Sequence, residues 1–378
     1  MRASKLTKIG MATLMFSCSV CAQESIKLGV IEPLTGSVAY NGTAYVNGAR
    51  LALAEYNKRT AAKPVQLVIE DGQCSPANSV NAAEKLIQKD KVVALLGAFC
   101  SSATAAVMPL AQQYKVPFLT GVSSQADLTE RNNPYFFRSA ETDALLAKAF
   151  AKILAEKLQL KRVAYIGVND DWGQGSIQGF SRDLATHGVK NVMTEYFDHG
   201  ATDFYTLLAK LRNAKADGVF IAAETQDGSI LVKQLKEFGI DINVFGVGSW
   251  ATSDFINLVG EASEGIYAAV PYVYTLPGDS NQQFVKAYQA QYKQFPDKYA
   301  AAGYNSTHIM LDAIGHADST DAAKIIASLK ATDYHAPNGN YRFTDQGQAY
   351  GFDAALVQIR QKVPEVVTST AVEAPEKK

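Results

Sequence analysis

Residues 26–58 read IKLGVIEPLTGSVAYNGTAYVNGARLALAEYNK, an apolar run followed by a polar turn and a longer segment with helical periodicity. The run 26–31 is apolar at nearly every position and does not alternate with polar residues. This pattern is typical of a parallel strand covered on both faces, because a strand with one solvated face alternates. The stretch therefore predicts the first strand of an α/β sheet and, over residues 44–58, its first crossover helix.

The same unit recurs along the chain. The first series continues with predicted strands at 65–70, 92–96, 116–120 and 135–138, and with helices at 77–89 and 102–114. A second series has strands at 162–168, 191–197, 218–222, 244–248 and 265–270, with helices at 175–187, 203–213 and 229–238. Two such series predict an α/β protein with two doubly wound, parallel-sheet domains of similar size.

The last third of the chain is expected to connect these domains. Helical patterns over 280–294 and 298–316 belong to neither series, and we expect them to return to the first domain. A predicted strand at 352–360 then crosses back to the second domain. Repeated crossings make a hinge, and a hinge between two α/β domains makes a cleft that can close. Residues 364–378 show no periodicity and are predicted to be a disordered tail.

The composition excludes several protein classes. The chain has 378 residues, of which 47% are hydrophobic and 19% charged, and its formal net charge is −1. These values are not those of a disordered chain, a coiled coil or a polybasic nucleic-acid binder. No apolar run approaches the roughly 18 residues that span a bilayer. We expect a soluble protein that does not bind nucleic acid.

The N-terminus has the order of a secretory signal peptide. Arg2, Lys5 and Lys8 precede an apolar stretch at 9–16, and Val20-Cys21-Ala22 resembles a cleavage site. We predict that residues 1–22 are removed on export, which takes the formal net charge from −1 to −4. A buried N-terminal helix is one alternative. Lipidation of Cys18 is another, although the residues before it match a lipoprotein signal poorly.

Cysteine and histidine usage is consistent with an exported protein that holds no metal. Cys74 and Cys100 alone remain after signal removal, and we expect them to form one disulfide. Two unpaired core thiols are the alternative. The five histidines are scattered, and no CxxC or HExxH spacing occurs. The sequence predicts neither a metal site nor a cofactor.

Polar residues follow the predicted strands, where open parallel sheets bind ligands. In the first series these include Phe99, Ser101 and Ser102 after one strand and Val122, Ser123 and Ser124 after another, with Asn41 following the first strand. In the second series they are Asp170, Asp171, Trp172 and Glu224. Hydroxyls and free amides at a helix start suit a carboxylate, and the facing acids suit an ammonium. The alternative is that each residue only caps a helix.

Enzyme signatures are mostly missing from the sequence. It contains no G-x-S-x-G elbow and no P-loop. Residues 173–179 read GQGSIQG, which is one residue longer than the dinucleotide-binding fingerprint. We therefore predict a protein that is not an enzyme and has no catalytic residues.

Several stretches carry a resemblance to a known family. They are IKLGVIEPLTGSVAYNG (26–42), NGARLALAEYN (47–57), EDGQCSP (70–76), GAFCSSAT (97–104), GVSSQADLT (121–129), FFRSA (136–140) and NDDWGQG (169–175). Over nearly its whole mature length the chain resembles the periplasmic leucine/isoleucine/valine-binding proteins of ABC transporters, which are type I periplasmic binding proteins. The resemblance implies two lobes joined by a three-crossover hinge, here 23–140 plus 272–343 and 141–271 plus 344–363. It also implies a periplasmic monomer that delivers a small ligand to an ABC permease of the inner membrane.

The resemblance assigns roles to individual residues. Cys74 and Cys100 match the family's disulfide. Ser101 matches the serine that holds the ligand carboxylate, and Ser124 matches a hydroxyl residue that contacts the amino-acid head. Val122 and Ser123 match positions that use backbone groups, and Trp172 matches an aromatic residue that covers the ligand.

Three positions depart from the family's pattern. Asn41 and Glu224 stand where the branched-chain binders carry Tyr, and Gly248 stands where they carry the acid that binds the ligand ammonium. We therefore hypothesise that Glu224 takes over this role, with Asp170 or Asp171 as second choice; the alternative is that Glu224 is solvated or caps a helix.

The expected ligand is a branched-chain amino acid or a related small carboxylate. The alternative function is a sensory receptor or lipoprotein that binds amides, ureas or aromatic acids.

Overall fold

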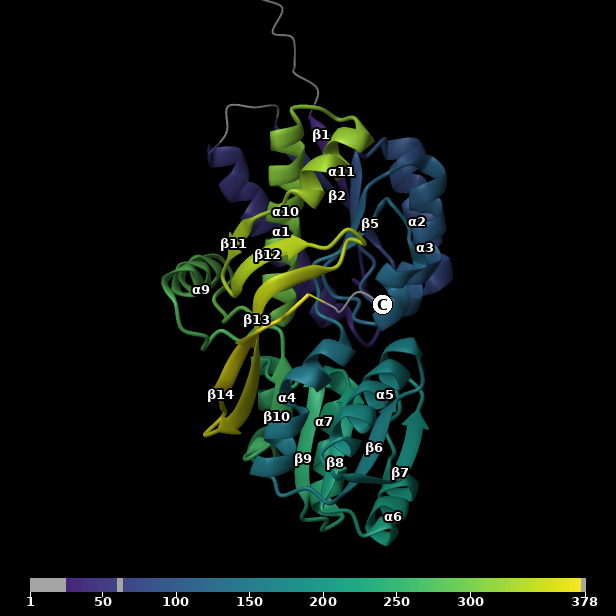
Figure 1. Ribbon diagram of the computed structural model, residues 1–378, viewed down its shortest axis with the longest axis vertical. Helices are drawn as coiled ribbons and strands as arrows, with labels where there is room; N and C mark the ends of the chain where they lie inside the picture. The colour runs from purple at the N-terminus through teal and green to yellow at the C-terminus, as the bar shows by residue number, and fades with distance from the viewer. Residues whose placement is uncertain (1–24, 60–63, 375–378) are drawn as a thin grey trace, which may run out of the picture.

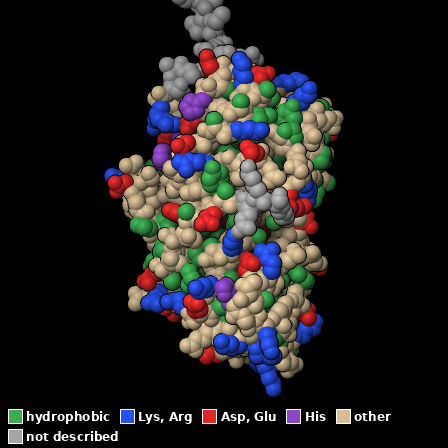
Figure 2. Space-filling view, viewed as in Figure 1, with side chains coloured by type: hydrophobic (Ala, Val, Ile, Leu, Met, Phe, Trp, Pro, Cys, Tyr) green, Lys and Arg blue, Asp and Glu red, His purple; other side chains and the backbone are tan. Residues whose placement is uncertain are grey.

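The computed structural model describes residues 25–59 and 64–374, which form two lobes stacked along the long axis (Figure 1). The predicted signal peptide at 1–22, including Cys18, lies outside the described residues. Within the described ranges, none of the helices combines the length and apolar character that crossing a membrane requires. Charged side chains of both signs are interspersed over both lobes on the face shown in Figure 2.

The first lobe is built on a parallel sheet with the order β2-β1-β3-β4-β5. Its strands are β1 (Ile26–Glu32), β2 (Val65–Asp71), β3 (Ala94–Gly97), β4 (Phe118–Thr120) and β5 (Phe136–Arg138). The helices between them are α1 (Ala39–Arg59), α2 (Pro76–Glu84) and α3 (Ser101–Tyr114). β3, β4 and β5 are buried at every position, as the continuous apolar runs predicted.

The second lobe repeats this topology. Its parallel strands have the order β7-β6-β8-β9-β10, and they are β6 (Arg162–Val168), β7 (Lys190–Phe197), β8 (Gly218–Ala223), β9 (Asn243–Gly248) and β10 (Tyr267–Val270). The helices of this part of the chain are α4 (Asp143–Lys157), α5 (Asp171–Ala185), α6 (Tyr205–Ala214), α7 (Thr225–Glu237) and α8 (Ser253–Val259). Both lobes thus have the strand order of a doubly wound sheet, with the first strand of each series next to the third.

The chain passes between the lobes three times. It leaves β5 for α4, which packs on α5, and it leaves β10 for α9 (Asp279–Tyr292) and α10 (Lys298–Ala317). Helix α10 packs against α1 and contacts β3 and β4, so it completes the first lobe. The third passage is β13 (Ala349–Arg360), which begins beside β12 (Gly339–Phe343) and ends antiparallel to β10. α11 (Ala322–Lys330) and β11 (Tyr334–Ala336) lie between α10 and β12 in the chain.

The predicted disordered tail at 364–378 is wrong over most of its length. Residues Val363–Ala371 form β14, which pairs antiparallel with β13. The turn between the two strands consists of Gln361 and Lys362, which have φ values of 49° and 63°. Two successive positive φ values are typical of a tight hairpin turn, which an Asn-Gly pair usually occupies. Because the sequence has Gln-Lys there instead, it gave no signal for the hairpin. The last residues, 375–378, lie outside the described residues.

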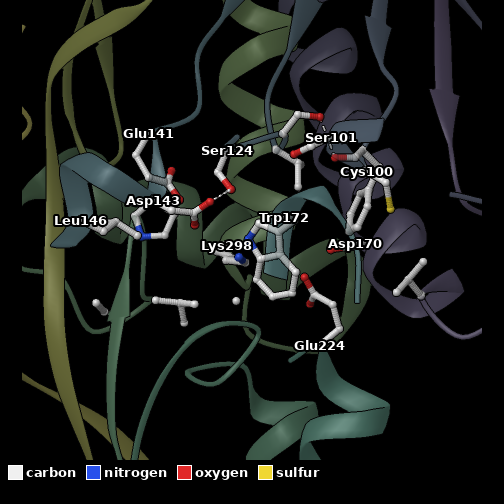
Figure 3. A pocket seen from close by; sticks show the side chains of 18 of the residues that line it. Cys100, Ser101, Ser124, Glu141, Asp143, Leu146, Asp170, Trp172, Glu224 and Lys298 are labelled. Atoms are coloured by element: carbon white, nitrogen blue, oxygen red, sulfur yellow. Dashed lines mark hydrogen bonds between the residues drawn. The ribbon is translucent and has the colours of Figure 1, made fainter. Parts of the chain in front are cut away.

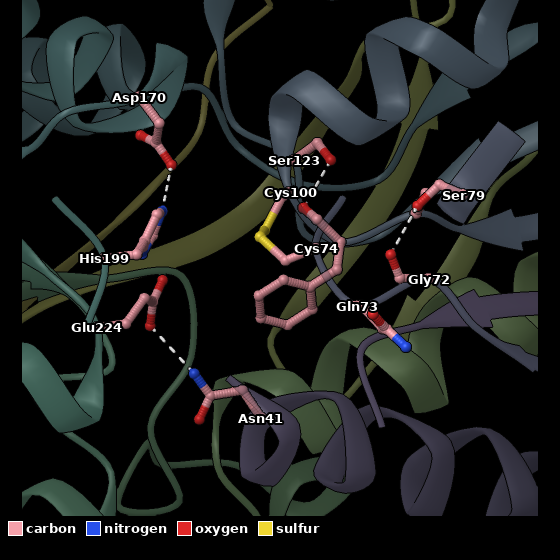
Figure 4. The surroundings of a disulfide bond; sticks show 12 residues. Asn41, Gly72, Gln73, Cys74, Ser79, Cys100, Ser123, Asp170, His199 and Glu224 are labelled. Atoms are coloured by element: carbon pink, nitrogen blue, oxygen red, sulfur yellow. Dashed lines mark hydrogen bonds and ion pairs between the residues drawn. A yellow bond between two sulfur atoms is a disulfide. The ribbon is translucent and has the colours of Figure 1, made fainter. Parts of the chain in front are cut away.

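The predicted disulfide between Cys74 and Cys100 is present, with the two Cα atoms 5.3 Å apart. It joins the loop after β2 to the N-terminus of α3, at the edge of the sheet that faces the second lobe (Figure 4). The loop of the chain that it closes spans 26 residues. The disulfide therefore fixes two strand-end loops relative to each other.

Removing this disulfide is expected to lower the free energy of unfolding. Closing a loop of this length restricts the unfolded chain, which corresponds to about 3–4 kcal/mol in the chain-entropy model. We expect the double variant Cys74→Ser, Cys100→Ser to lose this amount in urea unfolding, and the unreduced wild type to show no free thiol when unfolded. Two titratable thiols in the wild type would contradict the prediction.

Candidate functional site

The site lies where the two sheets turn their topological switch points toward each other. In the first sheet β1 and β3 are neighbours, and in the second β6 and β8 are neighbours. The connections diverge from these strands to opposite faces of each sheet, which leaves a crevice at the carboxyl ends. The loops after β3, β6 and β8 meet there, in a cavity of about 550 Å³ that is open to solvent (Figure 3).

Most of the predicted ligand-binding residues line this cavity. They are Phe99, Ser101, Val122, Ser123, Ser124, Trp172 and Glu224. Asn41 does not: it is buried in α1, where its Nδ2 donates to Glu224 Oε2 at 3.2 Å. Of the two second-choice acids, Asp170 lines the cavity, whereas Asp171 is exposed and lies outside it.

Ser101 provides a suitable position for an anion. It is the first residue of α3, and the N-cap residue, Cys100, makes no side-chain hydrogen bond to the first turn. The first-turn amides and the helix dipole therefore favour a negative group at this point. Ser101 Oγ accepts a hydrogen bond from the Gln125 amide at 3.3 Å, which leaves its proton available to donate to a ligand.

Ser123 holds the walls of the site together. Its hydroxyl donates to the Phe99 carbonyl at 2.7 Å and lies 2.7 Å from Thr104 Oγ1 (Figure 4). These bonds tie the loop after β4 to the loop after β3. Phe99 has a φ of 63°, and its ring packs on Tyr299 with a centroid distance of 5.2 Å. The Ser123 hydroxyl is thus already hydrogen-bonded within the protein, so only the backbone groups of Ser123 are left to contact a ligand.

The Ser124 hydroxyl is also hydrogen-bonded within the protein, and its partner is a carboxylate. Its hydroxyl donates to Asp143 Oδ2 at 2.9 Å (Figure 3). Asp143 and its neighbour Glu141 are buried and line the cavity. Burial raises the pKa of Glu141 to about 7, although Lys298 opposes the shift. Burial also raises the pKa of Asp143, against the effect of the Ser124 hydrogen bond.

Four charged residues of the cavity were not among the predicted ligand-binding residues. Glu141 and Asp143 follow β5, and His199 follows β7. A search for polar residues directly after each predicted strand, which found the other residues, would therefore have found these as well. Lys298 begins a helix instead, after Asp297, whose side chain accepts from the Ala300 amide at 2.8 Å. No strand end marks Lys298, so only the fold brings it to the cavity.

Glu224 reaches across the cleft between the lobes. It precedes α7 but makes no side-chain capping bond. Its Oε2 accepts hydrogen bonds from Asn41 of α1 and from the hydroxyl of Tyr299 in α10, both in the first lobe. Thr225 Oγ1 adds a bond to Asn41 Oδ1 at 3.4 Å. These contacts hold the two lobes together beside the cavity.

Trp172 and Gly248 share one part of the cavity wall. Gly248 has a φ of 86°, a conformation that side chains rarely adopt. A Cβ atom at this position would lie 3.1 Å from Trp172 Cη2. The indole therefore occupies the space next to position 248, and the glycine fits both the backbone and the ring.

Asp170 and His199 form a charged cluster at the edge of the cavity. Asp170 Oδ1 caps α5 by accepting from the Gly173 amide at 2.8 Å, and its Oδ2 lies 2.9 Å from His199 Nε2. Asp227 Oδ2 lies 3.8 Å from His199 Nδ1. The hydrogen bond with Asp170 and the neighbouring carboxylate of Asp227 raise the pKa of His199 to about 10. Among the described residues, no group of three or more His, Cys, Asp and Glu side chains is arranged to hold a metal ion.

The His199 cluster should make stability depend on pH. The pKa of His199 is about 10 in the folded protein and about 6.5 in an unfolded chain. Its stabilising contribution is therefore complete below pH 6.5 and is lost as the pH rises toward 10. We expect His199→Gln to lower the free energy of unfolding at pH 6, with a difference from wild type that shrinks steadily up to pH 10. His187→Gln, at an exposed position, is the control and should show no such trend. A difference that is constant over this range would contradict the prediction.

Comparisons with known proteins agree with this architecture. A family model described as periplasmic binding protein matches residues 25–364. A leucine-, isoleucine-, valine-, threonine- and alanine-binding protein of Pseudomonas aeruginosa is 26% identical over 92% of this chain and 93% of its own.

Solved structures share the fold. A branched-chain amino acid transporter substrate-binding protein of Streptococcus pneumoniae, in complex with isoleucine, has a TM-score of 0.83 and 25% identity over 92% of this chain and 99% of that chain. A solute-binding protein of an ABC transporter from R. palustris, in complex with benzoate, has a TM-score of 0.86 and 20% identity over 94% and 98% of the two chains. These relatives are binding proteins, which confirms the prediction that the chain is not an enzyme. The chain belongs to the periplasmic binding protein family and is a solute-binding protein of the ABC-transporter type.

Proposed function

We propose that this protein captures an amino acid, of the branched-chain class or a related small carboxylate, and presents it to an ABC permease of the inner membrane. The observation that carries the proposal is the polarity of the cavity. Ser101 and the uncapped start of α3 offer donors to a carboxylate, and Glu141, Asp143 and Glu224 offer negative charge to an ammonium in the same cavity. A zwitterionic head group complements both ends.

The charges favour an amine-bearing ligand over the alternatives. Benzoates, amides and ureas carry no ammonium, so they would add no positive charge to the cavity, where the buried carboxylates of Glu141 and Asp143 have only Lys298 and Arg138 to offset them. An uncompensated buried charge is costly. This argument favours an amino-acid transporter receptor over a receptor or lipoprotein for aromatic acids, amides or ureas.

We further propose that the ligand closes the lobes. The three passages of the chain form a hinge, and the bonds from Glu224 to Asn41 and Tyr299 exist only when the lobes are together. A ligand that contacts Ser101 in one lobe and Trp172 in the other would favour this closed form. The site residues proposed for the ligand are those named above that line the cavity, with Asn41 supporting Glu224.

The setting of this function follows from the family and the N-terminal sequence. We propose that residues 1–22 direct export to the periplasm, where the protein acts as a monomer, with lipid attachment at Cys18 as the alternative. The proposed lobes comprise residues 23–140 with 272–343 and residues 141–271 with the final strands.

A ligand screen tests the proposed class. We expect at least one of L-leucine, L-isoleucine, L-valine, L-threonine and L-alanine to bind the purified protein in calorimetry. At 100 times its dissociation constant, the ligand should add about 2.7 kcal/mol to the free energy of unfolding. Binding of benzoate or an aliphatic amide, with none of the five amino acids bound, would refute the proposal.

Closure is tested separately by small-angle X-ray scattering. The radius of gyration should fall when the confirmed ligand is added at saturation, because the lobes come together. Asn41→Ala, which removes a bond to Glu224, should shift the unliganded protein toward the larger radius. An unchanged radius in wild type at saturating ligand would argue against hinge closure.

A further inference from the structure

We propose that a second cavity, located at the hinge, binds a primary carboxamide group. This hinge cavity has a volume of about 410 Å³ and is open to solvent. It shares Glu141 and Lys298 with the ligand cavity and continues beyond them, toward the side of α10 (Figure 3). Two sources can supply the carboxamide: a small free amide, or the side chain of an amino acid held in the ligand cavity. Only the second source rests on the proposed function.

All three passages of the chain between the lobes take part in the hinge cavity. Residues 139–141 belong to the first passage, and Pro271 and Tyr272 belong to the second. Asn338 also lines the cavity and is bonded to the third passage, because its carbonyl accepts from the amide of Asp353 in β13 at 2.6 Å. A molecule in this cavity therefore lies at the meeting point of the three hinge segments.

One residue of the wall has a buried acceptor without a donor. Asn305 of α10 lines the cavity and is 2% exposed. Its Oδ1 has no hydrogen-bond partner within the part of the chain that the structure describes. A buried carbonyl oxygen without a partner is costly, and a donor in the cavity would remove that cost.

The orientation of the Asn305 amide is fixed by its neighbour Asn338. Asn338 Nδ2 lies 3.1 Å from the Pro271 carbonyl and 3.4 Å from the Asp353 carbonyl, and both of these groups only accept. Asn338 Oδ1 is therefore the atom that accepts from Asn305 Nδ2, at 3.0 Å. Turning the Asn305 amide over would bring two oxygens together. Asn305 thus presents its oxygen, and not its nitrogen, as the free group.

The wall favours a neutral ligand that has both donors and an acceptor. The Asn305 oxygen and the Glu141 carboxylate accept hydrogen bonds, and the Lys298 ammonium donates them. A primary carboxamide matches this set, because its nitrogen carries two protons and its oxygen accepts. A carboxylate has no proton to give to Asn305, and a cation would face the charge of Lys298. Glu141 and Lys298 have opposite charges, so a neutral group leaves their balance unchanged.

The first test uses propionamide and butanone, in which a methyl group replaces the amide nitrogen. In an NMR titration of the purified protein, propionamide should bind saturably and butanone at least tenfold more weakly. Asn305→Leu removes the free oxygen with little change in volume, so it should weaken propionamide binding about tenfold or more. Butanone binding should change less than threefold. Asn340→Leu, a half-buried position of β12 outside the cavity, is the matched control and should change neither.

The second test distinguishes the sources of the amide. If the side chain of a bound amino acid supplies it, L-glutamine should bind wild type at least tenfold more tightly than 5-oxo-L-norleucine, its methyl ketone analogue. Asn305→Leu should abolish this preference in calorimetry, and L-glutamine should displace propionamide. If the amide is a free molecule, propionamide should bind alongside L-glutamine, and its affinity should persist in Ser101→Ala.

A further variant covers the case in which Asn305→Leu does not fold. Lys298→Met removes the donor to the carbonyl oxygen, so it should weaken propionamide and butanone by the same factor. Propionamide binding that butanone matches, or that Asn305→Leu leaves intact and Ser101→Ala removes, would overturn the proposal, because the amide would then occupy the ligand cavity. No saturable propionamide binding together with no preference for L-glutamine would mean that the hinge cavity holds solvent only. If propionamide binds as expected and none of the five amino acids of the screen does, the proposed function fails and the hinge site stands.

Discussion

The guanidinium of Arg138 joins the hinge to the binding loop. It is fully buried at the end of β5, where the chain first leaves the first lobe. Its Nε donates to Gln348 Oε1 at 2.7 Å, just before β13 makes the third passage between the lobes. Its remaining nitrogens donate to the carbonyls of Ser123, Gln125 and Ala126 and to the hydroxyl of Thr129. Burial lowers its pKa to about 10, so the group remains charged and all its donors need partners.

The hydrogen bonds of Arg138 connect the segments that pass between the lobes to the wall of the cavity. The loop that Arg138 holds carries Val122 and Ser124 on the cavity wall, and the residues that follow Arg138 carry Glu141 and Asp143 to the same wall. Gln348 extends the connection by donating to the carbonyls of Ala140 and Ala349. If the lobes rotate as proposed, the wall that carries Val122 and Ser124 therefore lies next to the pivot, and the wall with Trp172 and Glu224 lies farther from it.

The carboxylates of the cavity differ in the groups that stabilise their charge. Asp170 has His199 beside it, and Glu224 has neutral donors from the first lobe. Asp143 accepts a hydrogen bond from Ser124, and the charges of Arg138 and Lys298 act on it. The resemblance to branched-chain amino-acid binders predicts where a ligand lies, but the exchange of the usual acid for Gly248 changes which carboxylate is available to it. The ring of Trp172 lies beside the glycine, 3.1 Å from where a Cβ atom would be.

The sequence by itself determined the two parallel sheets, because buried strands need continuous apolar runs, and most of the cavity wall, because ligands bind at strand ends. It also predicted the disulfide, since only Cys74 and Cys100 follow the predicted signal peptide. Tertiary structure decided the rest. The β13–β14 hairpin depends on positive φ values at Gln361 and Lys362, which no turn motif marks. Lys298 reaches the site from the start of α10, which follows the second passage of the chain between the lobes. The Ser124 hydroxyl donates to Asp143, which lies 19 residues later at the start of α4. This hydrogen bond between a loop and a helix exists only once the fold has brought the two together.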